Sequence, residues 1–260
     1  MLLVVVFVWA VPILWVVLTS LKQRTEIFTV PPTLWFRPTF ENYVTALETY
    51  GIADALVNSA IISVLTVALT LVIAIPAGYA YARHRFAGRR ALSFYTLFTQ
   101  MAPAIGILLP AFFIIGRLRL IDTFPAIILV YLSITVPISI WLMITYFEEI
   151  PRELEEAALV DGASRYVVFG RIMLPQALGG VMVTGVLAFI EAWNEFLFAS
   201  ILTGSQTRTV PVAIFAFLTT EETLWGPFTA TGVMIMAPVA LIALFAQRYI
   251  VKGLTIGAVK

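Results

Sequence analysis

The chain has 260 residues, of which 61% are hydrophobic and 12% are charged, and its formal net charge is +1. A soluble core of this length cannot bury so much apolar side chain, so the composition excludes an ordinary soluble domain. The small, scattered charge gives no sign of nucleic-acid binding. The absence of cysteine and the single histidine exclude disulfides, thiolate metal sites and multi-histidine sites.

Six apolar stretches are long enough to cross a bilayer as helices. A helix needs about 20 apolar residues to span a hydrocarbon core of roughly 30 Å. The stretches cover residues 1–20, 57–81, 91–116, 124–147, 177–202 and 228–251. We therefore predict an all-α polytopic membrane protein with about six transmembrane helices, forming one transmembrane domain over residues 1–260.

Basic residues in the loops indicate the orientation, because Lys and Arg are retained on the cytoplasmic side of a membrane. Ten Lys and Arg lie in the second loop, the fourth loop and the C-terminal tail, whereas six lie in the first, third and fifth loops. This asymmetry predicts that both termini are cytoplasmic.

The segment between the fourth and fifth stretches, residues 148–175, is too patterned for a disordered linker. Pro151 suits a first helical turn, and the acidic residues after it favour the positive end of the helix dipole. Gly162 supplies a left-handed residue that ends a helix, and Ser164 suits the cap of the next one. Three-and-four spacing places five residues on one face: Ile150, Leu154, Ala157, Ala158 and Asp161. The pattern predicts a helix, a turn and a second helix outside the membrane.

The same segment resembles the EAA motif of ABC importer permeases. The resemblance rests on Glu156-Ala157-Ala158, Gly162, Ile172 and Leu174-Pro175. It implies a coupling helix that docks in a cleft of an ATPase subunit, with seven coupling residues: Glu156, Ala157, Ala158, Asp161, Gly162, Leu174 and Pro175. Glu156 would contact or orient the ATPase, and the alanines would permit close docking. The alternative is an interfacial amphipathic hairpin without a partner.

Further stretches resemble the carbohydrate branch of that family, close to the second permease of maltose-type systems. They include Ser20-Leu21-Lys22, Ala77-Gly78-Tyr79-Ala80-Tyr81-Ala82-Arg83 and Ala192-Trp193-Asn194-Glu195-Phe196. The resemblance implies a type I ABC importer permease in a bacterial or archaeal plasma membrane, importing sugar by alternating access. The implied partners are a second homologous permease, an ATPase dimer that binds ATP and Mg²⁺, and an extracytoplasmic solute-binding protein. The chain itself would bind no cofactor.

Polar residues at membrane depth are the candidates for a substrate path, because ionisable groups there tend to face a bundle interior or water. The candidates are Glu191, Trp193, Asn194 and Glu195 of the fifth stretch and Asn58 of the second. Asn194 and Glu195 suit hydrogen bonds to sugar hydroxyls, and Trp193 suits stacking on a sugar face. Equally, these residues suit contacts between helices or with a partner permease.

Two other functions fit parts of the sequence. A permease for a sugar phosphate or a polyol is possible within the same branch, although the stretches offer no basic lining for an anion. An intramembrane enzyme would use Glu191 and Glu195, four residues apart, as paired carboxylates on one helix face. No Gly-rich phosphate-binding loop is present, so a separate subunit is expected to hydrolyse ATP.

Overall fold

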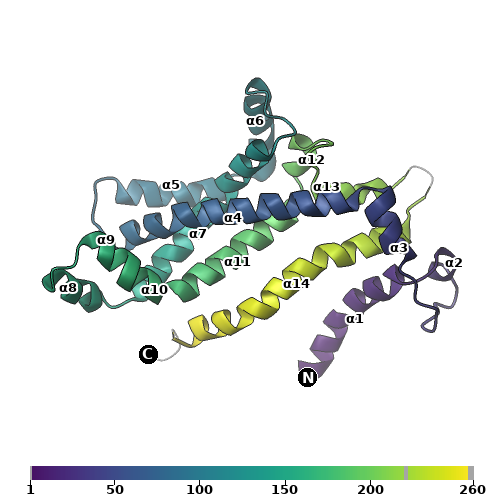
Figure 1. The fold of residues 1–260 in the computed structure, drawn as a ribbon, viewed down its shortest axis with the longest axis horizontal. Coiled ribbons are helices and arrows are strands. Elements are labelled where there is room, and N and C mark those ends of the chain that lie inside the picture. The colour runs from purple at the N-terminus through teal and green to yellow at the C-terminus, as the bar shows by residue number, and fades with distance from the viewer. Residues whose placement is uncertain (1, 220–221, 257–260) are drawn as a thin grey trace. The chain divides into compact units, whose positions relative to one another are not determined.

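The computed structural model describes residues 2–219 and 222–256, which form helices, turns and one isolated bridge between Leu218 and Thr223 (Figure 1). The prediction of an all-α chain is confirmed. The longer helices are α1 (Leu2–Ser20), α4 (Ile52–Arg83), α5 (Arg89–Met101), α6 (Ala104–Arg117), α7 (Phe124–Glu149), α8 (Arg152–Val160), α11 (Leu178–Asn194) and α14 (Trp225–Ile256). The shorter ones are α2 (Arg24–Ile27), α3 (Glu41–Val44), α9 (Arg165–Val167), α10 (Leu174–Gln176), α12 (Ala199–Leu202) and α13 (Val210–Ala213). Residues 45–49 and 168–173 are π-helical, and residues 214–217 form a 3₁₀ turn.

Three described helices are long and apolar enough to cross a membrane by themselves: Ile52–Arg83, Phe124–Glu149 and Trp225–Phe245. A fourth candidate is the pair Arg165–Gln176 and Leu178–Asn194, which is bent by 72°. Two shorter apolar helices, Val6–Ser20 and Ala104–Arg117, fall within the first and third predicted stretches. The six stretches therefore all contain apolar helix, and crossing by the two shorter helices stays a prediction.

Two predicted stretches are broken in the structure. The third, residues 91–116, divides into α5 and α6 because Ala102 and Pro103 are extended, with ψ of 128° and 126°. The fifth, residues 177–202, divides into α11 and α12, because Glu195 leaves the helix with ψ of 127°. Each of these two stretches therefore forms two helices.

The chain divides into two compact units, and α4 and α14 contribute residues to both. The first unit contains residues 1–60 and 203–241. In it, the Asn42 side chain donates hydrogen bonds to the carbonyls of Ser20 and Lys22, at 2.9 and 2.8 Å. Lys22 is buried, with its ammonium group 5.1 Å from the centre of the Trp15 ring. These contacts fix the end of α1 against α3.

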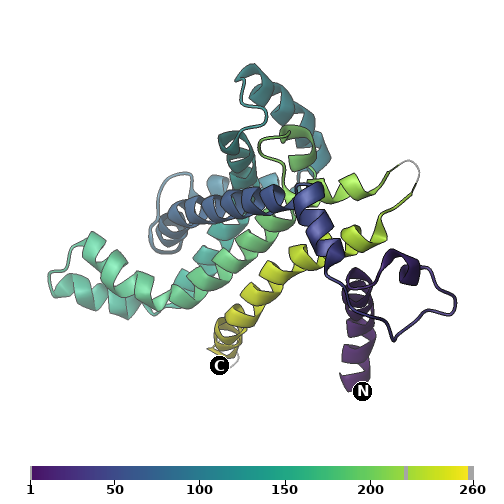
Figure 2. The ribbon, with the colours of Figure 1, turned by 45° about the vertical axis from the view of Figure 1, so that its right-hand side comes forward.

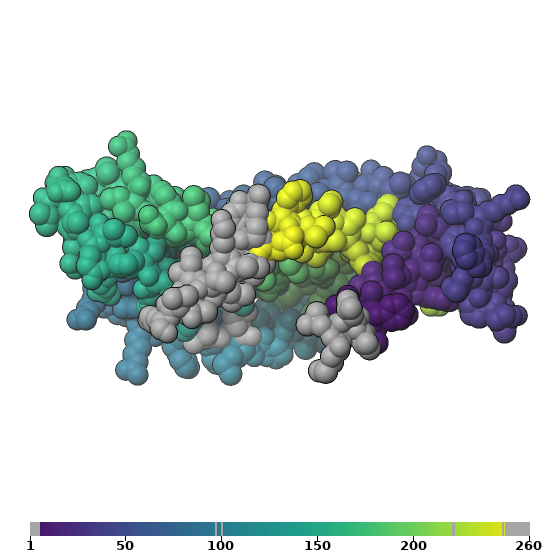
Figure 3. Space-filling model, turned by 90° about the horizontal axis from the view of Figure 1, so that it is seen from below, coloured from purple at the N-terminus to yellow at the C-terminus, as the bar shows by residue number. Residues whose placement is uncertain are grey.

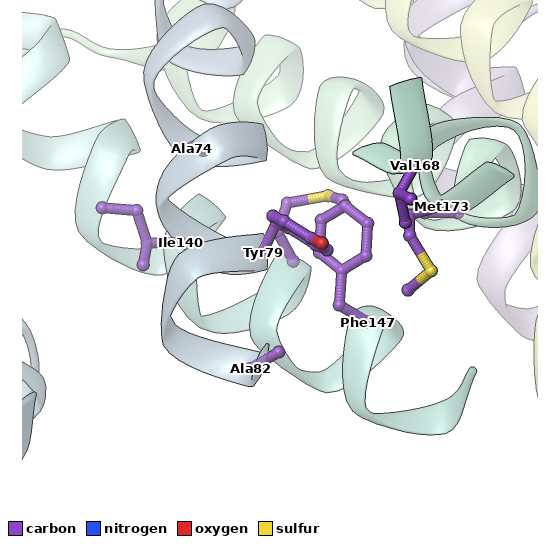
Figure 4. Packing of buried hydrophobic residues seen from close by; sticks show 9 residues of the cluster. Ala74, Tyr79, Ala82, Ile140, Phe147, Val168 and Met173 are labelled. Carbon is purple, nitrogen blue, oxygen red and sulfur yellow. The ribbon is translucent and has the colours of Figure 1, made fainter. Parts of the chain in front are cut away.

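The second unit contains residues 61–202 and 242–260, and its most extensive helix contact is between α7 and α11. The Thr70 and Thr135 hydroxyls hydrogen-bond at 2.7 Å in the buried contact of α4 with α7. A cluster of buried apolar side chains continues this contact towards the end of α4 (Figure 4): Ala74, Tyr79, Ala82, Ile140, Met143, Phe147, Val168, Met173 and Ala177. The π-helical turn at 168–173 thereby packs on the ends of α4 and α7.

Candidate coupling hairpin and solute path

Helix α8 forms where the sequence predicts it. Pro151, with φ of −56°, occupies the N-cap position, and the helix proper begins at Arg152. Glu153 and Glu155 lie in the first turn, where the positive end of the helix dipole stabilises acidic side chains. The short helix is therefore favoured by its own sequence.

The turn after α8 closes as a Schellman motif. Gly162 has φ of +83°, its N–H donates to the Leu159 carbonyl, and the Ala163 N–H donates to the Ala158 carbonyl. A left-handed residue at this position is usually glycine, because other L-residues meet a steric penalty there. Ser164 then caps α9 through a 3.4 Å hydrogen bond from the Val167 N–H to its hydroxyl oxygen. The predicted helix, turn and second helix are confirmed.

The outer face of this α8–α9 hairpin (residues 152–167) is exposed and partly apolar. Val160 is 87% exposed and Tyr166 is 90% exposed, and Glu156 and Ala157 lie on the open surface with them. In both ribbon views the hairpin lies at one end of α10 and α11 (Figures 1 and 2). In the space-filling view its green atoms lie on the surface at the left (Figure 3). Exposed apolar side chains gathered on one surface are typical of sites that contact another protein or a membrane.

The inner face of the hairpin packs on its own chain. Ile150 and Ala158 contact the apolar cluster at the end of α4, whereas Leu154, Ala157 and Asp161 are exposed. The five residues that the spacing placed on one face therefore divide between a packed side and an exposed side. Of the two alanines predicted to dock against a partner, Ala158 lies inward in this structure and Ala157 lies outward.

A polar network that the sequence reasoning missed joins α8 to the end of α4. The Tyr79 hydroxyl donates to Glu155 Oε1 at 2.7 Å, and Arg83 Nε lies 3.5 Å from Glu155 Oε2. Arg83 also donates to the Ile150 carbonyl. No local sequence signal links positions 79 and 155, because the contact depends on how α4 packs beside the hairpin.

Leu174 and Pro175 open α10, where proline is tolerated because the first turn of a helix needs no N–H partner. Leu174 is half-buried and Pro175 is exposed. The chain then bends by 72° between Gln176 and Leu178 as it enters α11. Leu174 and Pro175 therefore lie where the chain turns from the hairpin into the fifth stretch.

The polar residues of the fifth stretch surround the end of α11. The Glu195 carboxylate accepts hydrogen bonds from the N–H groups of Phe198, at 2.8 Å, and Ala199, at 3.1 Å. The Glu195 carbonyl accepts a 3.4 Å hydrogen bond from the Tyr131 hydroxyl. Glu195 thus caps the first turn of the next helix, and its carboxylate oxygens are engaged by its own backbone.

The neighbouring candidates differ in accessibility. Trp193 is 3% exposed and stacks on Phe189, with the ring centres 5.5 Å apart. The Asn194 side chain is exposed and donates to the Ile190 carbonyl at 2.8 Å. Glu191 is half-buried. In this conformation Asn194 and Glu191 offer polar atoms at the surface of the unit, and Trp193 is part of its core.

Asn58 belongs to the other unit and ties two of its segments together. Its side-chain amide donates to the carbonyls of Gln206, at 3.1 Å, and Arg208, at 3.2 Å. The adjacent Ser59 hydroxyl accepts a 2.8 Å hydrogen bond from the Val210 N–H. These contacts hold the start of α4 to the loop that precedes α13.

Comparison with known proteins gives the family. Residues 71–256 match the family described as "Binding-protein-dependent transport system inner membrane component". The match covers most of the chain, including the hairpin. The chain belongs to this family.

The permease is similar to proteins of the same class along nearly its whole length. It is 37% identical to a probable ABC transporter permease of Sinorhizobium fredii, over 99% of this chain and 92% of that protein. It is 36% identical to the trehalose/maltose permease MalG of Thermococcus litoralis, over 96% of this chain and 91% of that protein. A bacterial ABC transporter involved in alginate import has the same fold, with a TM-score of 0.77, 24% identity, and 95% and 94% coverage.

Family membership and geometry together exclude the enzyme alternative. The family consists of transport permeases, and ATP hydrolysis belongs to a separate subunit. Moreover, α11 ends at Asn194, so Glu195 does not share a helix face with Glu191. The permease is a multi-pass protein of the plasma membrane that works within a binding-protein-dependent ABC transport system.

Proposed function

We propose that this permease carries a neutral sugar or oligosaccharide into the cell, with both of its termini in the cytoplasm. The observation that best supports a sugar is the 36% identity to the trehalose/maltose permease over 96% of this chain. The candidate path residues Glu191 and Asn194 bring no positive charge, which disfavours a phosphorylated solute. The basic loops described above support the orientation.

The partners in this proposal are a second homologous permease, an ATPase dimer and an extracytoplasmic solute-binding protein. ATP and Mg²⁺ bind the ATPase subunits. Closure of the ATPase dimer moves the coupling hairpins of the two permeases together, and the spans then open outward to receive sugar from the binding protein. Hydrolysis returns the transporter to the inward-facing state.

The α8–α9 hairpin is the proposed contact with the ATPase. Glu156 and Ala157 lie on its open surface, and Asp161 and Gly162 form the turn that separates its two helices. A capped, preorganised helix with an exposed apolar edge suits a groove on a partner protein. Ala158, on the inner face, supports the hairpin from within. Leu174 and Pro175 direct the chain from the hairpin into α11.

The solute path is proposed to include Asn194 and Glu191, whose polar atoms reach the surface of their unit. Trp193 and Glu195 support the end of α11 beside this path, since each is engaged with its own chain. Asn58, in the other unit, holds the start of α4 to the loop before α13. Direct stacking of a sugar on Trp193 would require the ring to leave Phe189.

Co-purification from the native membrane in mild detergent tests the coupling role. The intact chain is compared with Gly162→Pro, which cannot adopt the positive φ of the turn, and with Gly179→Ala. Gly179 lies in α11 with open space around an added Cβ, so its substitution is a matched control. We expect the ATPase subunit to accompany the intact chain and the control and to be lost from Gly162→Pro.

Uptake tests the substrate. The purified complex is reconstituted with its binding protein, and ATP-dependent accumulation of labelled maltose and trehalose is measured. Uptake of a phosphorylated sugar in place of both neutral sugars would overturn the substrate proposal. A chain that purifies without any ATPase subunit would overturn the coupling proposal.

A further inference from the structure

The α8–α9 hairpin is attached to three long helices in two different ways. Helices α7 and α11 continue into it along the backbone, through Ile150 on one side and α10 on the other. Helix α4 reaches it through side chains: Tyr79 and Arg83 contact Glu155, and Arg83 also contacts the Ile150 carbonyl. The hairpin thus meets α4 only through noncovalent contacts, which are these polar contacts and the apolar packing described above.

The charged pair in this attachment is withdrawn from solvent. The Arg83 side chain is 3% exposed and the Glu155 side chain is 14% exposed. Removing one member of such a pair leaves an uncompensated buried charge, so separating the two groups carries an energetic cost. By contrast, the pair of Arg89 with Glu148 on neighbouring helices is 37% and 53% exposed and contributes little rigidity.

Tyr79 connects this pair to the packed core. Its ring packs against Phe147 (Figure 4), with ring centres 5.4 Å apart. It also packs against Phe169 at 5.0 Å, while its hydroxyl reaches Glu155. One residue earlier, Gly78 lies so close to Met143 that an added Cβ would clash at 2.5 Å. The end of α4 is thus held closely against α7 at the level where it contacts α8.

The network of Tyr79, Arg83 and Glu155 borders the surface of the hairpin that is proposed to contact the ATPase. Arg83 and Glu155 line a small surface cavity together with Arg152, Glu156 and Leu159. Glu156, the residue proposed to meet the ATPase, therefore lies beside this pair and next to Glu155 on α8. A partner that contacts Glu156 would therefore act on the residue next to Glu155, which contacts α4.

We propose that Tyr79, Arg83 and Glu155 form a latch that makes α4 move with the coupling hairpin during the transport cycle. All three are positioning residues, and the inference rests on the proposed function. Weakening the latch should uncouple ATP hydrolysis from solute movement, because the hairpin would respond to the ATPase while α4 lagged behind.

The test compares sugar uptake and ATP hydrolysis in the same proteoliposomes containing the full complex. Glu155→Gln keeps an acceptor for Tyr79 but removes the charge, and Tyr79→Phe keeps the ring but removes the hydroxyl. Glu153→Gln, on the exposed side of α8, and Tyr81→Phe, in α4, are matched controls. We expect uptake per ATP hydrolysed to fall about 2- to 30-fold in the latch variants, the range typical of coupling mutations, and to stay unchanged in the controls.

The double variant sharpens the result. Tyr79→Phe removes the hydrogen bond to Glu155 and Glu155→Gln removes the charge that faces Arg83, so the double variant should be less uncoupled than the product of the two single effects if both contacts belong to one attachment of α4. Unchanged coupling in both single variants, with the complex intact, overturns the latch alone. Absence of an ATPase subunit from the unmodified complex overturns the proposed function as well.

A distance measurement gives an answer even if a latch variant fails to assemble. The chain has no cysteine, so spin labels attach only at introduced sites, here Val72→Cys on α4 and Val160→Cys on α8, both exposed positions. In the unmodified latch, the distance between the labels should be the same in nucleotide-free and ATP-trapped complexes. A distance that changes between the two states overturns the latch.

Discussion

The α8–α9 hairpin and the polar cluster at residues 191–195 both stood out in the sequence, and the structure uses them in opposite ways. In the hairpin, the capping residues Gly162 and Ser164 form the turn and leave Glu156 and Ala157 on an open surface. In the cluster, Glu195 turns its carboxylate to its own backbone. Hydrocarbon supplies no hydrogen-bond partners. A polar side chain next to the end of a membrane helix is therefore favoured to hydrogen-bond the free backbone groups there.

The largest effect is expected for Glu195→Ala, which separates a capping role from a sugar-binding one. Loss of the carboxylate leaves the N–H groups of Phe198 and Ala199 without this partner, at about 1–3 kcal/mol for each buried group. Thermal unfolding in detergent should show a clearly lower midpoint, with a smaller drop for Glu195→Gln. Normal stability combined with lost sugar uptake would contradict the capping role.

A smaller effect is expected for Gly162→Ala in the hairpin. Adding a Cβ meets open space but forces an L-residue into a φ of +83°, at a cost of about 1–2 kcal/mol. The strain falls on the turn, so ATPase binding should weaken, and the unfolding midpoint should fall by only a few degrees, less than for Glu195→Ala. Binding as tight as that of Gly179→Ala would show that the turn geometry is unimportant for docking.

Ser164→Ala tests the cap of the second hairpin helix. The 3.4 Å hydrogen bond from the Val167 N–H is long, so its loss should cost about 0.5 kcal/mol, the lower end of the range for N-caps. Hydrogen exchange at the first turn of α9 should accelerate a few-fold. Exchange rates that do not change would mean that the packing of Val168 holds the helix without the cap.

The smallest effect on stability is expected for Asn194→Ala. Its side chain is exposed and donates to Ile190 within the same helix, so the change in unfolding free energy should stay within about 0.5 kcal/mol. If Asn194 lines the solute path, the apparent KM for sugar uptake should rise in the assembled complex. Unchanged uptake kinetics would remove Asn194 from the path.

Short-range features of this protein were predictable from the sequence. Apolar runs of about 20 residues dictate helices, because only intrahelical hydrogen bonds satisfy the backbone in hydrocarbon. The turn at Gly162 and the cap at Ser164 were equally predictable, since their hydrogen bonds join residues at most five positions apart. The EAA spacing pointed to the family that the comparisons then established.

What the sequence could not decide depends on which helices lie side by side. The motif singled out Glu156 and gave Glu155 no role, yet the packing of α4 beside α8 brings Glu155 to Tyr79 and Arg83 and leaves Glu156 on the open surface. The same packing turns Ala158 inward and Ala157 outward. Local hydrogen bonds determine the helix–turn–helix geometry of the hairpin. Contacts between residues more than 70 positions apart determine which of its faces is buried against α4 and which is exposed.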